Sequence, residues 1–153
     1  MNLNFSAKLV YGIIAIKNVS MGNGAPVKSY EIAKKYPEMS LHFLEQVFRV
    51  LRGKGFVRSL RGPGGGYVLT RPANMISVKD IVVAFESNIR SQRYLPKEIE
   101  EIESISRNKV LRELETYTLL DIQNMEREET ATDSAFSRQL KQWAEKSVNE
   151  IRT

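Results

Sequence analysis

The chain contains no cysteine and only one histidine, His42. The absence of cysteine excludes disulfides, thiol nucleophiles and thiolate metal ligands. A single histidine excludes any metal site that needs two imidazole ligands, and the carboxylates follow no recognisable metal-binding spacing. We therefore expect no metal ligands and no bound cofactor.

Other signals are also missing. No apolar run reaches the roughly 18 residues that a membrane-spanning helix needs, and Asn2, Asn4 and Ser6 interrupt any secretory signal pattern at the N-terminus. There is no phosphate-binding glycine loop followed by Lys-Ser or Lys-Thr, and no serine-centred nucleophile elbow. We expect a cytoplasmic protein without a membrane partner, without catalytic residues and without enzymatic activity.

The charge is divided unevenly along the 153 residues, a length that suits one domain, or one small domain with an appendage. Residues 1–95 hold 14 basic and 5 acidic side chains, a net charge of +9. Residues 96–153 hold 9 basic and 13 acidic side chains, a net charge of −4. This division predicts that only the first part meets a polyanion, although charge also varies along chains that bind none.

Apolar periodicity predicts three helices in the first third, at residues 5–20, 30–35 and 41–52. Ser29 and Ser40 are N-cap candidates for the second and third of these helices. The third helix has one apolar face, and its opposite face carries polar and basic side chains, namely His42, Glu45, Gln46, Arg49 and Arg52.

A glycine-rich stretch follows the third helix at residues 61–67, Arg-Gly-Pro-Gly-Gly-Gly-Tyr. Runs favouring β-structure flank it at residues 56–59 and 67–70, which predicts a hairpin with a projecting tip. Three helices followed by a hairpin is the order of a winged helix-turn-helix, in which the helix before the hairpin enters the DNA major groove. The alternative is an ordinary surface hairpin.

The second half is expected to contain a helix over 78–85 capped by Ser77, a polar loop over 87–95, and a long helix over 96–116. So long a helix cannot bury its apolar face on a small domain alone, so we expect it to pack antiparallel against a second copy. Packing on its own domain is the alternative. The expected dimerisation residues are Ile99, Ile102, Ile105, Val110, Leu114 and Tyr117.

Beyond the long helix we expect a short helix over 118–125, a charged linker over 126–132 and a last amphipathic helix beginning at Asp133. The fold class is therefore mainly α with a small β-hairpin. The expected units are a DNA-binding domain at 1–86, a dimerisation segment at 87–125 and a C-terminal helix within 126–153.

Three stretches resemble one known family. They are residues 40–48 (Ser-Leu-His-Phe-Leu-Glu-Gln-Val-Phe), 51–55 (Leu-Arg-Gly-Lys-Gly) and the glycine-rich stretch 61–67. Together they are similar to the Rrf-type winged helix-turn-helix transcriptional regulators of bacteria, the family of IscR, NsrR and CymR. The resemblance covers residues 1 to about 125 and implies a homodimer on an inverted-repeat operator.

The resemblance also implies roles. Polar residues at the start of the third helix would face DNA, and Arg61 would enter the minor groove, where negative potential is enhanced. Glu45 can accept from a cytosine amino group and Gln46 can pair with adenine, while basic side chains and glycine backbone amides would meet phosphates. The alternative is a solvated surface. The expected DNA-binding residues are Ser40, His42, Glu45, Gln46, Arg49, Arg52, Arg58, Arg61, Gly62, Gly64 and Gly65, with Lys54, Lys8 and Lys28 as further phosphate candidates.

One departure from the family matters. Its cluster-binding members carry three cysteines in the loop that corresponds to residues 87–95, and here that loop has none. The chain therefore resembles a member without an iron–sulfur cluster. We expect a homodimeric repressor that binds double-stranded DNA, and the alternative is a winged-helix interaction module that acts through a partner enzyme. The signal is left open between a small-molecule effector, a partner protein and none.

Overall fold

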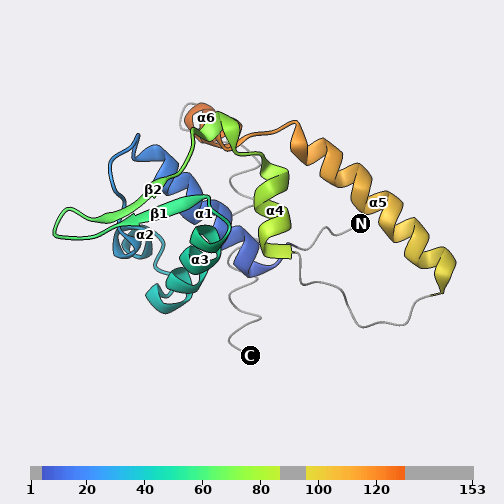
Figure 1. Cartoon of the computed structure of the whole chain (residues 1–153), viewed down its shortest axis with the longest axis horizontal. Coiled ribbons are helices and arrows are strands. Elements are labelled where there is room, and N and C mark those ends of the chain that lie inside the picture. The colour runs from blue at the N-terminus through green and yellow to red at the C-terminus, as the bar shows by residue number, and fades with distance from the viewer. Residues whose placement is uncertain (1–4, 87–95, 130–153) are drawn as a thin grey trace.

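The computed structural model describes residues 5–86 and 96–129. Figure 1 shows a helical body with a two-stranded hairpin, which confirms the predicted fold class. In chain order the elements are α1 (Ala7–Met21), α2 (Ser29–Lys35), α3 (Leu41–Gly53), β1 (Val57–Leu60), β2 (Gly66–Leu69), the 3-10 helix η1 (Ala73–Met75), α4 (Val78–Glu86), α5 (Lys97–Glu115) and α6 (Leu119–Glu129).

Serine hydroxyls mark where several helices begin. The hydroxyl oxygens of Ser6, Ser40 and Ser77 accept from the backbone N–H groups of Leu9, Phe43 and Asp80 at 3.1–3.2 Å. Each bond satisfies one of the N–H groups that a helix leaves without an internal partner at its start. The N-caps expected at Ser40 and Ser77 are confirmed.

The apolar core joins the first four helices to the base of the hairpin. Its largest fully buried side chains include Leu9 and Ile16 of α1, Phe48 of α3 and Ile81 of α4. The buried residues of α3 are Leu44, Val47, Phe48 and Leu51, as its helical spacing predicted. Because this face is buried, the polar face of α3 is directed to solvent.

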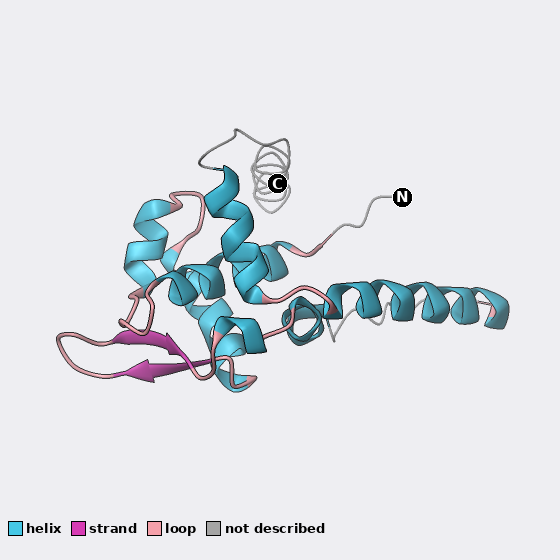
Figure 2. Cartoon of the chain, turned by 90° about the horizontal axis from the view of Figure 1, so that it is seen from above, coloured by secondary structure: helices cyan, strands magenta, loops and turns pink. Residues whose placement is uncertain are grey.

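The two strands pair antiparallel, with Val57 opposite Leu69 and Leu60 opposite Gly66. Each strand is displaced by one residue from the sequence prediction. Val27 exchanges two backbone hydrogen bonds with Tyr67 at 2.8 and 3.0 Å, which ties the segment before α2 to β2. These bonds hold β2 near the end of the strand that leads from the tip, and the tip itself projects from the body (Figure 2).

Helix α5 extends from the body on the side opposite the hairpin (Figure 2) and has no fully buried residue. Leu111 and Leu114, in its second half, are half-buried against the core of their own chain. Ile99, Ile102 and Ile105, in the first half, are 43, 59 and 56% exposed. Within the described residues, the apolar face of the first half of α5 is therefore not covered.

Two further sequence predictions were wrong in detail. The linker expected from residue 126 is helical as far as Glu129, because glutamate and arginine are good helix formers that need no burial. Ser29 is not the N-cap of α2; it is the first residue of that helix, and the Glu31 side chain instead accepts from the backbone N–H of Lys28 at 3.2 Å. The long helix was expected over about 96–116, and this is confirmed: it spans 97–115, with Pro96 and Thr116 as its cap residues. The loop over 87–95 and the helix expected from Asp133 lie outside the described residues.

Candidate nucleic-acid interface

The N-terminal half of α3 presents its polar side chains together. Ser40, His42 and Glu45 are exposed and Gln46 is half-buried. The side-chain nitrogen of Gln46 lies 3.0 Å from Nε2 of His42, within hydrogen-bonding distance. The predicted polar groups therefore share one surface of one helix, although two of them already bond to each other.

Glu45 connects α3 with α2 and the hairpin. One of its carboxylate oxygens accepts a short hydrogen bond from the Ser29 hydroxyl, and the other accepts from the Tyr67 hydroxyl at 3.4 Å. The ring of Tyr67 stacks on Phe48, with centroids 3.9 Å apart and an interplanar angle of 7°. Glu45 is thus held in one orientation while its side chain stays exposed.

Burial raises the pKa of the Tyr67 hydroxyl, and the charge of Glu45 and its hydrogen bond raise it further, while Arg52 lowers it slightly. Because the ordinary tyrosine pKa is about 10, the hydroxyl stays protonated near neutral pH and keeps its role as a donor. No pattern in the sequence places Tyr67 beside Glu45. Ser29 was missed as a site residue, since only the packing of α2 on α3 brings it there.

The tip of the hairpin carries Arg61, which is exposed. Lys28, at the start of α2, donates from Nζ to the carbonyl of Pro63 at 3.2 Å. This bond links the tip to the body and gives Lys28 a structural role besides the phosphate contact expected for it. Arg61 therefore extends from a loop that is held at two places, by Lys28 and by the strand pairing.

The glycines of the tip do not serve one purpose. Gly62 is exposed with φ +99°, a region that other residues rarely adopt, and Gly64 is exposed with open space around it. Gly65 is buried, and a Cβ there would lie 2.2 Å from the Leu60 carbonyl oxygen. Its N–H donates to the Gly62 carbonyl at 2.9 Å, so the predicted role of this amide as a phosphate donor is not supported.

Basic side chains surround α3 and the hairpin. They are exposed and form no ion pair with a described residue; the set is Arg49, Arg52, Lys54, Arg58 and Arg61. Uncompensated positive charge of this kind attracts the phosphates of a nucleic acid. Five of the fourteen basic residues of the first part, residues 1–95, thus lie on α3, on the hairpin or between them.

The side chains and helices of the described part of the chain also bear on metal binding and on membrane insertion. Among residues 5–86 and 96–129, no three histidine, aspartate or glutamate side chains lie close enough to hold a metal ion. In the same part of the chain no helix is both long and apolar enough to cross a bilayer.

A recognition helix packed on two preceding helices and followed by a basic hairpin defines a winged helix-turn-helix. The family model for Rrf2, described as an iron-dependent transcriptional regulator, matches residues 5–125. This chain therefore belongs to the Rrf2 family of transcriptional regulators.

Curated relatives agree with this assignment. The chain is 36% identical over 91 residues to the HTH-type transcriptional regulator IscR of Cereibacter sphaeroides, covering 58% of this chain and 59% of that protein. It is 35% identical over 92 residues to IscR of Escherichia coli, covering 60% and 56%. The chain thus spans less than two thirds of the length of these relatives.

Solved structures show the same fold. The cysteine regulator CymR of B. subtilis superposes with a TM-score of 0.68 at 30% identity, covering 81% of this chain and 98% of that one. IscR of T. potens gives a TM-score of 0.68 at 30% identity, covering 86% and 93%. The expected resemblance to this family is confirmed.

Proposed function

We propose that this protein is a sequence-specific DNA-binding repressor that acts as a homodimer on an inverted-repeat operator. The observation that carries the proposal is the arrangement of α3: its polar face is exposed next to a basic hairpin whose tip presents Arg61. Such a helix fits the major groove, and the hairpin then reaches the adjacent minor groove or backbone. The relatives named above are transcriptional regulators, so an interaction module acting through a partner enzyme is the less favoured function.

Selection from random double-stranded DNA tests this proposal, because it requires no assumed operator sequence. We expect enrichment of an inverted repeat whose half-sites are centred about one helical turn apart. Enrichment of a single half-site would contradict the two-fold arrangement. A lack of any enriched sequence at moderate salt would overturn sequence-specific binding.

Replacing Arg61 with alanine is expected to weaken binding to the selected sequence by about 1–3 kcal/mol, because the guanidinium would leave the minor groove. Gel shifts on the selected DNA measure this loss. Lys97→Ala is the matched control, since it removes one positive charge from α5, on the side opposite the hairpin. Equal affinity and unchanged base preference for the Arg61 variant would exclude the minor-groove role.

The carboxylate of Glu45 is expected to select a cytosine in each half-site. Glu45→Ala should relax the preference at that base pair by about 1–3 kcal/mol, measured by gel shifts with each base in turn. Ser29→Ala is the control, because it removes a donor that holds Glu45 but leaves the carboxylate in place. If both variants keep the full preference, Glu45 serves only to join α2, α3 and the hairpin.

Helix α5 supports a dimer. The charge also changes sign along the helix. The first half holds Lys97 and four glutamates, at positions 98, 100, 101 and 103, a net charge of −3. The second half holds Arg107, Lys109 and Arg112 against Glu113 and Glu115, a net charge of +1. In an antiparallel pair of these helices the acidic half of each lies against the basic half of the other. A parallel pair would place like charges together. The proposed interface therefore consists of Ile99, Ile102 and Ile105, with Val110 and Tyr117 as flanking candidates.

The proposed regulator contains no iron–sulfur cluster. The family description names iron, but the donor set of this chain does not fit a cysteine-ligated centre, because the chain has no cysteine. The described residues also contain no other group of side chains suited to a metal ion. The signal that controls this protein is therefore expected to be of another kind.

A further inference from the structure

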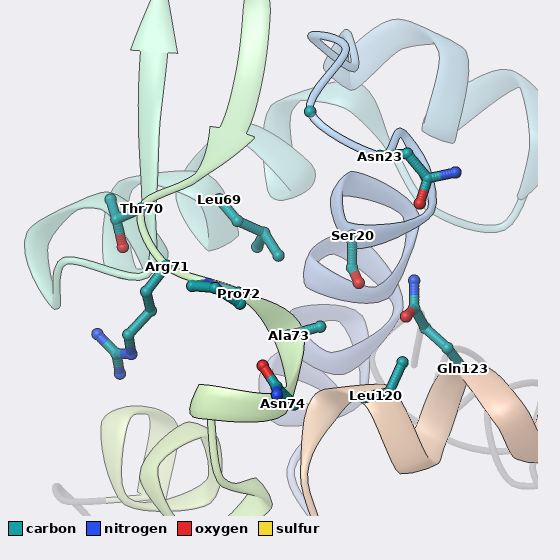
Figure 3. A pocket seen from close by; sticks show the side chains of 11 residues that line it. Ser20, Asn23, Leu69, Thr70, Arg71, Pro72, Ala73, Asn74, Leu120 and Gln123 are labelled. Carbon is teal, nitrogen blue, oxygen red and sulfur yellow. The ribbon is translucent and has the colours of Figure 1, made fainter.

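A cavity of about 500 Å³, open to solvent, lies between the end of α1, the connection from β2 to η1, and α6 (Figure 3). Its polar walls come from Ser20, Asn23, Asn74 and Gln123, and its apolar walls include Leu69 and Leu120. No residue of α3 lines this cavity, so it is separate from the polar face of that helix. The nucleic-acid interface described above therefore makes no use of it.

One polar wall residue carries a buried group without a partner among the described residues, and a second buried residue lies beside it. Ser20 is 7% exposed, and its hydroxyl has no hydrogen bond. Gln123 is 6% exposed, and its side-chain amide forms no hydrogen bond with another described residue. Figure 3 shows the Ser20 hydroxyl and the Gln123 amide directed toward each other from α1 and α6. Buried polar groups in folded proteins are nearly always bonded, so the Ser20 hydroxyl calls for a bound partner, and the neighbouring Gln123 amide can contact the same molecule.

The chemistry of the walls defines the class of that partner. The only charged wall residue, Arg71, points away in Figure 3, donates from Nε to the Met75 carbonyl at 3.2 Å and lies over the Phe56 ring. The Thr70 hydroxyl is also engaged, with the carbonyls of Gly55 and Phe56. What is left is one hydroxyl and three carboxamides, which offer neighbouring donors and acceptors but no net charge.

We propose that this cavity binds a small uncharged molecule with a carboxamide-like edge, in which a donor and an acceptor are adjacent. Such an edge pairs with the amide of Gln123 and leaves an atom to satisfy the Ser20 hydroxyl. The site joins α6, which continues the chain from the proposed dimerisation helix, to the base of the hairpin. A ligand here contacts both units, which is the position required of an effector that couples them.

Nicotinamide serves as the probe, titrated into the full-length protein without DNA and followed by the amide NMR signals of Gln123, Asn23 and Asn74. We expect saturable shifts. Nicotinate has the same ring with a carboxylate in place of the amide, and it should give weaker binding. Ser20→Ala and Gln123→Met should each weaken binding by roughly 2–10-fold, the loss of about one hydrogen bond.

Far-UV circular dichroism checks that the variants are folded. If a variant at a buried position does not fold, Asn74→Ala still tests the proposal, because Asn74 is an exposed residue of the cavity wall. Three outcomes would each overturn the proposal: shifts that rise linearly without saturation, an affinity for nicotinate equal to that for nicotinamide, or an affinity for nicotinamide in all three variants equal to that of the parent protein. The cavity would then hold water only. Because no DNA is present, this result is independent of the proposed repressor function.

Discussion

Substitution of Ile102 with aspartate is expected to convert the proposed dimer into monomers. Ile102 is 59% exposed in the single chain and lies at the middle of the uncovered isoleucine face of α5. In the dimer a second copy would bury this position. Burial of a carboxylate without a partner there is unfavourable by far more free energy than the remaining contacts of the interface contribute at that position. Sedimentation velocity should therefore show one chain where the parent protein shows two. Affinity for an inverted repeat should fall by roughly 10²-fold or more, because the second half-site no longer binds as part of the same molecule.

Ser104→Asp is the matched control. It adds the same charge to the same helix at an exposed position outside the isoleucine face, and this variant should remain dimeric. The hairpin and α3 are remote from α5, which carries both substitutions (Figure 1), so each variant should still bind a single half-site weakly. If the Ile102→Asp protein is still a dimer, α5 does not form the interface. If the parent protein is a monomer, the proposed dimer is wrong.

Truncation of Phe48 to alanine is expected to lower the free energy of unfolding by about 3–5 kcal/mol, the usual cost of deleting a buried aromatic side chain. Phe48 is fully buried on α3, and its ring stacks on Tyr67 of β2. The variant should therefore lose stability and also the contact that orients the hairpin against α3. Urea unfolding followed by circular dichroism measures the first effect, at one fixed protein concentration because dimerisation contributes to stability.

Leu41→Ala is the corresponding control, since Leu41 belongs to the same helix but is 46% exposed. Its effect on unfolding should stay below about 1 kcal/mol. Gel shifts then separate the two consequences for Phe48: a folded variant at low temperature should bind DNA more weakly than the parent protein. Equal stability of the Phe48 and Leu41 variants would show that the α3–hairpin packing contributes little to the core.

Helices were predicted well where local chemistry decides them. The spacing of Leu44, Val47, Phe48 and Leu51 defines one face of α3, and Ser40 supplies a hydroxyl where the first free N–H groups need one. The continuation of α6 to Glu129 was missed because a run of charged residues resembles a linker in composition. Charged side chains nevertheless support an exposed helix, and no apolar pattern is needed there.

The sequence predicted that the main candidate residues are exposed, but it did not predict their contacts with one another. The exposed positions of Glu45 and Arg61 follow from helical and hairpin periodicity. The bond from Ser29 to Glu45 does not, because its partners are far apart in the chain and meet only when α2 packs on α3. Gly65 was assigned to phosphate binding on composition alone, whereas the turn itself needs a residue without a side chain there.

The sequence by itself determined the class of this protein: the helical periodicities, the glycine-rich hairpin, the division of charge and the absence of cysteine all act locally or through composition. Only the tertiary structure decided which groups work together. Packing placed Tyr67 and Ser29 on the two oxygens of Glu45, and it left the isoleucines of α5 uncovered. It also buried Ser20 and Gln123 beside a shared cavity. These pairings join residues distant in the chain, so only folding, which brings their elements into contact, can create them.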